Sequence, residues 1–345
     1  MGREDQLINQ LALAVPSAIG RRGGVHSSRG GARLGIGDDA AIVLPRRNAD
    51  FLLTCDAFLE GVHFLRDRHP PDSVGYKSLA RATSDIAAMG GAPRFFMLTL
   101  ALPQHHTGQW FTGFLRGMRR AARQLGAELI GGDTTRFPSV SIGITVLGEI
   151  AAGRAITRSG AQPGDLLYVT GKLGCAQLGL EIIRNCPMSE VKRAMRSQSQ
   201  FLKRHLYPQI RVGLGGWLAK HRIASAMIDI SDGLSTDLSH LCAASGVGAR
   251  VCADRIPRVE IPPGQSRLAR HRKLDPLQMA LHGGDDYELL FAVPRRFARR
   301  LRSAPEFRDI APIGEIERGR HILLVDLNGH TKTLRPGGWD PFQAK

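Results

Sequence analysis

The pattern of apolar and polar positions along the chain predicts alternating helices and strands. Apolar residues recur at helical spacing in 4–15 and 72–89, and the second segment ends at two glycines and a proline. Short apolar runs at 40–44 and 51–55 indicate strands. The other elements expected in this half are a strand at 95–102, a helix at 108–125 and strands at 128–130 and 140–147.

A second half is expected to begin beyond the Gly- and Pro-rich stretch at 148–164. Mixed halves of this kind imply layered sheets covered by helices, so the predicted fold class is α/β with two α/β domains, 1–150 and 151–345. The elements expected in the second half are strands at 166–170 and 226–230 and helices at 174–184, 188–201, 211–220 and 235–244.

Segment 20–35 is rich in Gly, Ser and Arg and is predicted to be a mobile loop. A loop that grips phosphate is an alternative interpretation of the same composition. The pattern does not choose between the two.

Composition restricts the class of protein. The 345 residues suffice for two domains, and 43% apolar residues with 6% aromatics are typical of a globular chain. A net charge of +16 favours anionic partners. The basic residues are scattered and no nucleic-acid-binding motif accompanies them, so small phosphorylated substrates are expected and nucleic acid is not.

Cysteine content and hydropathy indicate the compartment. The five cysteines are odd in number and form no C-x-x-C pair, which argues against a disulfide framework and a zinc site. No segment approaches the roughly 18 apolar residues of a membrane span, and the amino terminus lacks a signal-peptide core. A cytoplasmic protein without membrane attachment is expected.

Aspartates recur beside small residues, and this is the main chemical signal in the sequence. Adjacent acids in Gly35–Ala41 repel each other and therefore require compensation. Oxygen ligands of this kind suit magnesium, which binds through a few carboxylates together with substrate phosphates. We therefore predict a magnesium-nucleotide site, with these further aspartates as candidates: Asp56, Asp85, Asp133, Asp229 and Asp232.

Local context supports several of these candidates. The strand at 51–55 runs straight into Asp56, which we expect at the strand end, where ligand sites are commonly built. Asp85 lies on a predicted helix among small neighbours that would let a metal or phosphate approach. Segment 131–136 combines bare backbone, a carboxylate, hydroxyls and a guanidinium, as a nucleotide phosphate and its metal require.

Other nucleotide-binding signatures are absent. No G-x-x-x-x-G-K-[ST] motif occurs, which excludes a P-loop kinase at the level of motif. The glycines at 35 and 37 imitate a dinucleotide fingerprint, but a strand rather than a helix is predicted after them. Protein-kinase signatures are also missing.

Seven short motifs follow one another along the chain: GIGDD at 35–39, CDAFLEGVHF at 55–64, SDIAAMGG at 84–91, GGDTTR at 131–136, TRSGA at 157–161, DISDGL at 229–234 and GGDDYEL at 283–289. Taken together, these motifs closely resemble the thiamine-monophosphate kinase family, within the superfamily of aminoimidazole ribonucleotide synthetase. The resemblance extends from about residue 4 to Trp339, with the motifs in the family's order.

This resemblance implies phosphorylation of thiamine monophosphate to thiamine diphosphate with ATP and several Mg²⁺ ions, by a homodimer whose amino-terminal halves pair. The implied metal ligands are Asp39, Thr54, Cys55, Asp56, Asp85, Asp133, Asp229 and Asp232. The residues implied to contact ATP are Gly132, Asp133, Arg158 and Ser231. Those implied to contact thiamine phosphate are His63, Asp285 and Trp339.

The chain departs from the family pattern at two of these positions. Cys55 replaces a hydroxyl residue, which alters the metal site if the side chain is the ligand and is harmless if the backbone carbonyl is. Asp285 replaces Glu and is one methylene shorter, which affects its reach to the substrate.

Physical chemistry indicates how such a transfer would proceed. The acceptor is a phosphate monoester with a second pKa of about 6, so it is largely ionised near pH 7 and needs no general base. Catalysis then consists of aligning two phosphates and neutralising their repulsion with magnesium. We expect direct transfer without a phosphoenzyme and without an acid or base side chain.

Two alternatives to this interpretation stay open at this point. One is another ATP-using enzyme of the same superfamily, acting on a ribonucleotide amide or a hydrogenase-maturation substrate. The other is a basic nucleic-acid-binding protein whose acidic motifs are only turns. A substrate panel tests the first alternative, and the salt dependence of DNA binding tests the second.

Overall fold

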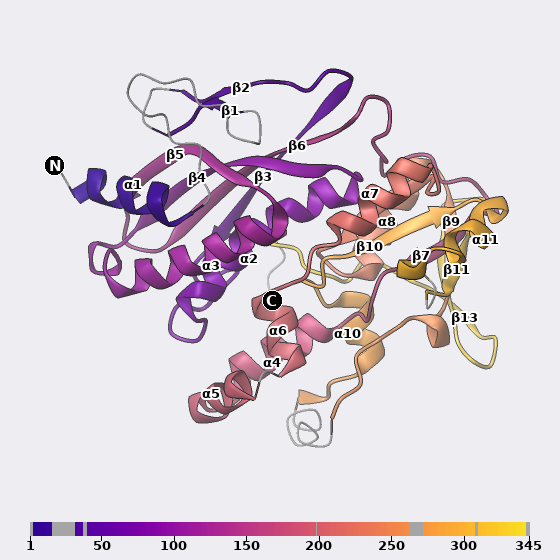
Figure 1. Cartoon of the computed structure of the whole chain (residues 1–345). Coiled ribbons are helices and arrows are strands. Elements are labelled where there is room, and N and C mark those ends of the chain that lie inside the picture. Colours follow the sequence, from indigo (N-terminus) through magenta and orange to yellow (C-terminus); the bar gives the residue numbers. More distant parts are fainter. Residues whose placement is uncertain are drawn as a thin grey trace. The chain divides into compact units, whose positions relative to one another are not determined.

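The computed structural model describes residues 3–15, 32–36, 40–197, 199–262, 272–307 and 310–342. The chain is a two-sheet α/β protein, and it divides into two compact units (Figure 1). The first unit is Met1–Ile86 with Gly91–Gly153, and the second is Ala87–Gly90 with Arg154–Lys345.

A four-stranded mixed sheet in the order β3-β6-β4-β5 forms the centre of the first unit. Strands β4 and β5 are parallel, whereas β6 is antiparallel to both β3 and β4. The strands of the sheet are β3 (Ala49–Leu59), β4 (Ala92–Leu102), β5 (Glu128–Arg136) and β6 (Ser141–Ala151). The first unit also contains the helices α1 (Arg3–Ala14), α2 (Pro71–Ala88), α3 (Gln109–Leu125) and η1 (Gln104–His106), and a small hairpin of β1 (Ala32–Leu34) and β2 (Ile42–Val43).

The two faces of this sheet differ in how they are covered. Leu52 and Phe58 on one face of β3 are buried, whereas Leu53 on the opposite face is 70% exposed. Helices α2 and α3 lie along one face of the sheet (Figure 1). These helices approach closely because α3 carries Gly117, where a Cβ would lie 1.7 Å from the Asp72 carbonyl oxygen.

The second unit contains a seven-stranded mixed sheet in the order β13-β12-β9-β11-β7-β10-β8. Its strands are β7 (Leu166–Val169), β8 (Ala226–Ile230), β9 (Gly248–Cys252), β10 (Glu288–Val293), β11 (Pro312–Glu317), β12 (Ile322–Val325) and β13 (Thr331–Thr333). Its helices are α4 (Cys175–Asn185), α5 (Met188–Arg196), α6 (Gln200–Leu206), α7 (Val212–His221), α8 (Leu234–Ser245), α10 (Pro276–His282) and α11 (Ala298–Arg302), with short η2 (Ala253–Arg255), η4 (Arg295–Phe297) and η5 (Pro305–Phe307).

Helix α8 anchors the core of the second unit. Its Leu234, Leu238 and Leu241 recur at helical spacing, are fully buried and share one cluster with Ile230 of β8 and Leu290 of β10. The strand β8 and the helix α8 are therefore fixed on both sides of the short turn that connects them.

Most expected elements are present, and several expectations are corrected. The strand predicted at 128–130 continues as β5 to Arg136. The helix predicted at 188–201 is two helices, α5 and α6, because a break near Ser199 interrupts it. Part of the predicted loop at 20–35 is strand β1, and the rest up to 31 lies outside the described residues. Strand β3 continues past Asp56 to Leu59, so this aspartate lies within a strand rather than at its end.

Candidate functional site

In the first unit, a strand and a helix bring a hydroxyl and a carboxylate of the predicted set together. Thr54 on β3 donates a hydrogen bond from its hydroxyl to Asp85 Oδ2 on α2, over 2.5 Å. Asp85 follows the small buried Ser84, as the sequence indicated. These two predicted metal ligands are therefore in direct contact.

Asp56 lies two residues along the same face of β3 and has a cationic partner. Arg81 on α2, one helical turn before Asp85, approaches Asp56 Oδ2 with its Nε at 3.3 Å. The Arg81 guanidinium also lies 5.6 Å from the centre of the Phe58 ring. Helix α2 thus presents a cation to Asp56 and a carboxylate to Thr54.

Cys55 faces away from these two neighbours. Successive side chains of a strand point to opposite faces, and Cys55 is exposed, with Thr145 of β6 donating a hydrogen bond to its sulfur over 3.5 Å. The thiol therefore lies on the face opposite Thr54 and Asp56. A ligand from the thiol would therefore lie on the face opposite Thr54 and Asp56, whereas a ligand from the backbone carbonyl would not depend on this orientation.

Gly132 and Asp133 lie on β5, within a strand rather than in the turn that their glycine-rich context suggests. A Cβ at Gly132 would lie 1.9 Å from the Leu98 carbonyl oxygen, and its φ is +150°, so this position requires glycine. The two parallel strands β4 and β5 thereby pass close to each other at Asp133.

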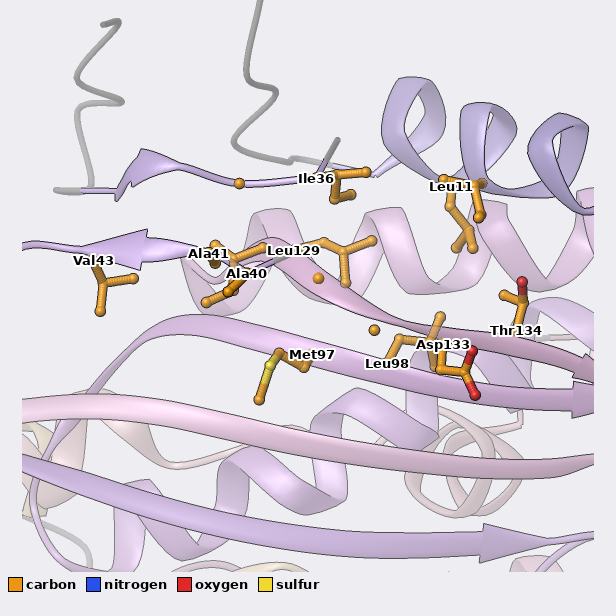
Figure 2. A pocket seen from close by; sticks show the side chains of 15 residues that line it. Leu11, Ile36, Ala40, Ala41, Val43, Met97, Leu98, Leu129, Asp133 and Thr134 are labelled. Carbon is orange, nitrogen blue, oxygen red and sulfur yellow. The ribbon is translucent and has the colours of Figure 1, made fainter. Parts of the chain in front are cut away.

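Beside Asp133 is a cavity of about 720 Å³, lined mostly by apolar side chains. Figure 2 shows its walls, with Leu11 and Ile36 across from Leu129 and Asp133. Thr134 also lines it; its hydroxyl is buried and has no hydrogen-bond partner among the described residues. A large apolar cavity with a carboxylate and an unsatisfied hydroxyl is the usual form of a small-molecule site.

His63 lies just after β3 and is fixed by the backbone. The Leu59 amide donates to His63 Nδ1 over 3.0 Å, and the ring centre lies 5.6 Å from that of Phe58. Since Nδ1 accepts this hydrogen bond, the remaining ring nitrogen is the one that can donate to a ligand.

In the second unit, the predicted ligands Asp229 and Asp232 flank the end of β8. Asp229 is buried, and the amides of Ser231, Asp232 and Gly233 each donate to Asp237 Oδ2 over 3.1 Å. Burial, then the nearby Asp229 and Asp232 charges, raise the pKa of Asp237 to about 8. A helical carboxyl group therefore holds the turn that carries Ser231 and Asp232.

Trp339 reaches this turn through its backbone. Its amide donates to the Asp232 carbonyl oxygen over 2.9 Å. The preceding amides, of Gly337 and Gly338, donate to the hydroxyls of Ser235 and Thr236. The C-terminal tail is thus hydrogen-bonded to the turn and to the first turn of α8.

Asp285 occupies a left-handed backbone conformation with φ +69°, which is uncommon for a residue other than glycine. The Tyr287 hydroxyl donates to its Oδ1 over 2.8 Å, and His205 Nδ1 lies 3.7 Å from its Oδ2. The Asp285 amide donates to the Ser231 carbonyl oxygen. This aspartate is therefore linked directly to the turn after β8.

Sequence reasoning missed Glu288, although it lies within the Gly283–Leu289 motif. Its carboxylate is 1% exposed and forms a double hydrogen bond, both distances 2.6 Å, with Arg211. Arg204 and the Thr170 hydroxyl complete its set of partners. Asp237 was missed as well; its position within the first two turns after the DISDG segment is the signal that could have found it.

Asp286, beside Asp285, is fully buried and accepts hydrogen bonds from the Gly174 and Ala176 amides at the start of α4. Burial raises the pKa of Asp286 to about 7. Through Asp286, the GGDDYEL motif therefore fixes the start of α4. Through Glu288, the same motif binds two arginines.

The predicted residues fall into a set on each unit. The first unit carries Thr54, Cys55, Asp56, His63, Asp85, Gly132 and Asp133, and the second carries Arg158, Asp229, Ser231, Asp232, Asp285 and Trp339. Arg158 is exposed, and its carbonyl oxygen accepts a hydrogen bond from Ser245. Asp39 lies outside the described residues.

The donors on each unit suit a hard divalent cation. They are carboxylate and hydroxyl oxygens, the ligands that Mg²⁺ takes in proteins. Among the described residues no three acidic, His or Cys side chains form a closed metal cluster. Mg²⁺ does not require one, since it usually binds through one or two carboxylates together with waters and substrate phosphates.

Two protein-family models match most of the chain. The N-terminal domain of AIR synthase related proteins matches residues 37–150, and the C-terminal domain matches 162–326. A thiamine-monophosphate kinase from Salmonella typhimurium is 40% identical over 274 residues, which cover 78% of this chain and 79% of that protein. The chain belongs to the thiamine-monophosphate kinase family.

Solved structures agree with this family assignment. The crystal structure of thiamine-monophosphate kinase from Stenotrophomonas maltophilia K279a is 34% identical with a TM-score of 0.74, covering 94% of this chain and 96% of that one. AaThiL complexed with AMPPCP and TMP is 32% identical with a TM-score of 0.73, covering 89% and 92%. The resemblance inferred from the motifs is thereby confirmed, and with it membership in a family of ATP-dependent phosphotransferases.

No helix in the described part of the chain combines the length and apolar character that a membrane crossing needs.

Proposed function

We propose that the protein transfers the terminal phosphoryl group of ATP to thiamine monophosphate and releases ADP and thiamine diphosphate. The bond from phosphorus to the ADP oxygen breaks as a bond to an oxygen of the monoester phosphate forms. The observation that carries this proposal is the 40% identity to a thiamine-monophosphate kinase, together with carboxylate and hydroxyl oxygens at those of its motifs that hold Thr54, Asp56, Asp85, Asp133 and Asp229.

Several Mg²⁺ ions would neutralise the repulsion between the two phosphates during this transfer. The proposed magnesium ligands on the first unit are Asp39, Thr54, Asp56, Asp85, Asp133 and the carbonyl of residue 55. Asp229 and Asp232 are the proposed ligands on the other unit. No side chain is assigned as an acid or base, because the acceptor is already ionised near neutral pH.

The cavity beside Asp133 supports a nucleotide site on the first unit. Its volume of about 720 Å³ lies within the range of small-molecule sites, and its apolar walls suit an adenine ring. Gly132 and Asp133 are the proposed ATP contacts in this cavity. Arg158 and Ser231 are the proposed ATP contacts on the second unit. His63, Asp285 and Trp339 are the proposed contacts to thiamine monophosphate.

The exposed face of the four-stranded sheet supports a homodimer formed by the first unit. Phe51 and Leu53 on β3 are exposed by 41% and 70%. Apolar side chains gathered on an uncovered sheet face indicate an interaction surface. A second copy of the same face is the partner that we propose.

Conversion of thiamine monophosphate by wild-type protein, with ATP and Mg²⁺ or with excess chelator, tests the function. Asp133→Asn tests the site, and Asp67→Asn is the matched control because the Asp67 side chain is 91% exposed. We expect magnesium-dependent thiamine diphosphate from wild type and the control, and a loss of about 10²-fold or more in Asp133→Asn.

A folded wild-type protein that forms no thiamine diphosphate would refute the proposed acceptor. The same assay with other phosphorylated acceptors would then identify the reaction. A covalent phosphoprotein on the kinetic path would refute direct transfer.

A further inference from the structure

The first turn of α8 holds three consecutive polar side chains, and each contacts a segment outside the helix. Ser235 Oγ accepts from the Gly337 amide over 3.2 Å and lies 2.8 Å from His282 Nδ1. Thr236 Oγ1 accepts from the Gly338 amide over 3.1 Å. Asp237 holds the turn before the helix, as described above.

Helix capping does not account for the contacts that Ser235 and Thr236 make. Polar residues at a helix start commonly bind the helix's own first amides. Here the N-cap is Gly233, which makes no side-chain cap hydrogen bond. The Ser235 and Thr236 hydroxyls instead receive amides of the C-terminal tail, about one hundred residues away in sequence.

The tail and the turn also touch each other directly. A Cβ at Gly338 would lie 1.9 Å from the Asp232 carbonyl oxygen and 2.7 Å from Thr236 Oγ1. The next amide, of Trp339, donates to that same carbonyl oxygen. Only glycine lets the tail come this close, so the position of Trp339 depends on contacts that its own side chain does not make.

We propose that Ser235, Thr236 and Asp237 are positioning residues that fix the Trp339 tail on the Asp232 turn. They touch neither substrate nor metal; they set the distance between a proposed thiamine contact and a proposed magnesium ligand. This role rests on the proposed function, because it concerns how the thiamine and magnesium contacts of that reaction are aligned.

Thr236→Val and Gly338→Ala test the tail contact. Valine keeps the shape of threonine and removes the acceptor, and alanine introduces the Cβ that meets the Asp232 carbonyl oxygen. We expect each to raise the KM for thiamine monophosphate about fivefold or more, as the loss of one net hydrogen bond would, with the KM for ATP unchanged. Ser239→Ala is the matched control, since within the described part of the chain the Ser239 hydroxyl binds only the Thr236 carbonyl oxygen of its own helix.

Asp237 is tested by a pair of variants. Asp237→Ala removes the acceptor of three amides, whereas Asp237→Asn keeps one acceptor oxygen. We expect kcat to fall in the alanine variant and to recover substantially in the asparagine variant. Equal loss in both variants would contradict a positioning role for the Asp237 acceptor.

Amide hydrogen exchange of segment 335–342 provides a readout that needs no substrate. Exchange there should be faster in Thr236→Val and Gly338→Ala than in wild type or Ser239→Ala. Unchanged exchange and unchanged KM in both variants would overturn the inference. If wild type does not phosphorylate thiamine monophosphate, the proposed function fails, and exchange alone then decides whether α8 holds the tail.

Discussion

The first unit presents Thr54, Asp56 and Asp85 on regular elements, whereas the second presents Asp232 and Trp339 on a turn and a tail. Thr54 and Asp85 lie on β3 and α2 and contact each other directly. Asp232 lies on a turn held by Asp237, and Trp339 lies on a tail held by its backbone amides. The first arrangement follows from packing of a sheet and a helix, and the second requires specific hydrogen bonds.

This difference indicates where substitutions can be tolerated. On the first unit the ligand positions are maintained by a buried core, so a changed ligand alters chemistry with little effect on structure. On the second unit, residues that are not ligands decide where the ligands lie. The predictions below test that contrast, in order of decreasing expected effect.

The largest effect is expected for Asp85→Asn on the first unit. The change removes the charge that would face a metal ion and keeps the side-chain shape, so kcat should fall by about 10²- to 10³-fold. The melting temperature should change by only a few degrees, because the α2 backbone and its packing remain. Steady-state kinetics and calorimetry measure the two quantities; a large loss of stability would contradict the view that the scaffold alone holds Asp85.

The next effect concerns the exposed sheet face of the first unit. Leu53→Asp should weaken the proposed dimer by at least about tenfold, or about 1.4 kcal/mol, because a carboxylate would be buried against an apolar face. Analytical ultracentrifugation over a range of concentrations measures the shift. Leu327→Asp, at a residue that is 82% exposed in the second unit, should leave association unchanged.

A smaller effect is expected at the strained motif of the second unit. Tyr287→Phe removes the hydrogen bond to Asp285 and keeps the buried ring. Loss of one net hydrogen bond corresponds to about 1 kcal/mol, so the KM for thiamine monophosphate should rise about fivefold. An unchanged KM would show that Asp285 is held without Tyr287, or that it does not contact the substrate.

The same contrast explains how much could be predicted from the sequence. Periodicity predicted α2, α3 and β8, because their apolar faces are buried and therefore set a local pattern. It misplaced the ends of β3 and β5, because acids and glycines such as Asp56 and Gly132 indicate turns in isolation. In both strands, pairing with neighbours distant in sequence overrides that local preference.

The candidate ligands were identifiable because they lie in short motifs, but the residues that hold them were not. Ser235 and Thr236 act on a segment that only the fold brings to them. A sequence pattern reports neighbours along the chain, and the Thr236 hydroxyl binds an amide about one hundred residues away. The same limit applies to Glu288, whose arginine partners lie on other elements.

The smallest effect is expected where this chain departs from its family on the first unit. Cys55→Thr restores a hydroxyl at a position whose side chain lies on the sheet face opposite Thr54 and Asp56. Exposed substitutions of this kind change free energies by about 0.5 kcal/mol or less, so kcat and the KM for both substrates should stay within about twofold of wild type. Kinetics over a range of Mg²⁺ concentrations provides the measurement, with Cys252→Ser as the control at a partly exposed thiol of the second unit.

A marked change in magnesium dependence in Cys55→Thr alone would mean that the side chain at position 55 reaches the metal, contrary to the strand geometry. An unchanged dependence would leave the backbone carbonyl as the contribution of this position, since the carbonyl is the same in every variant.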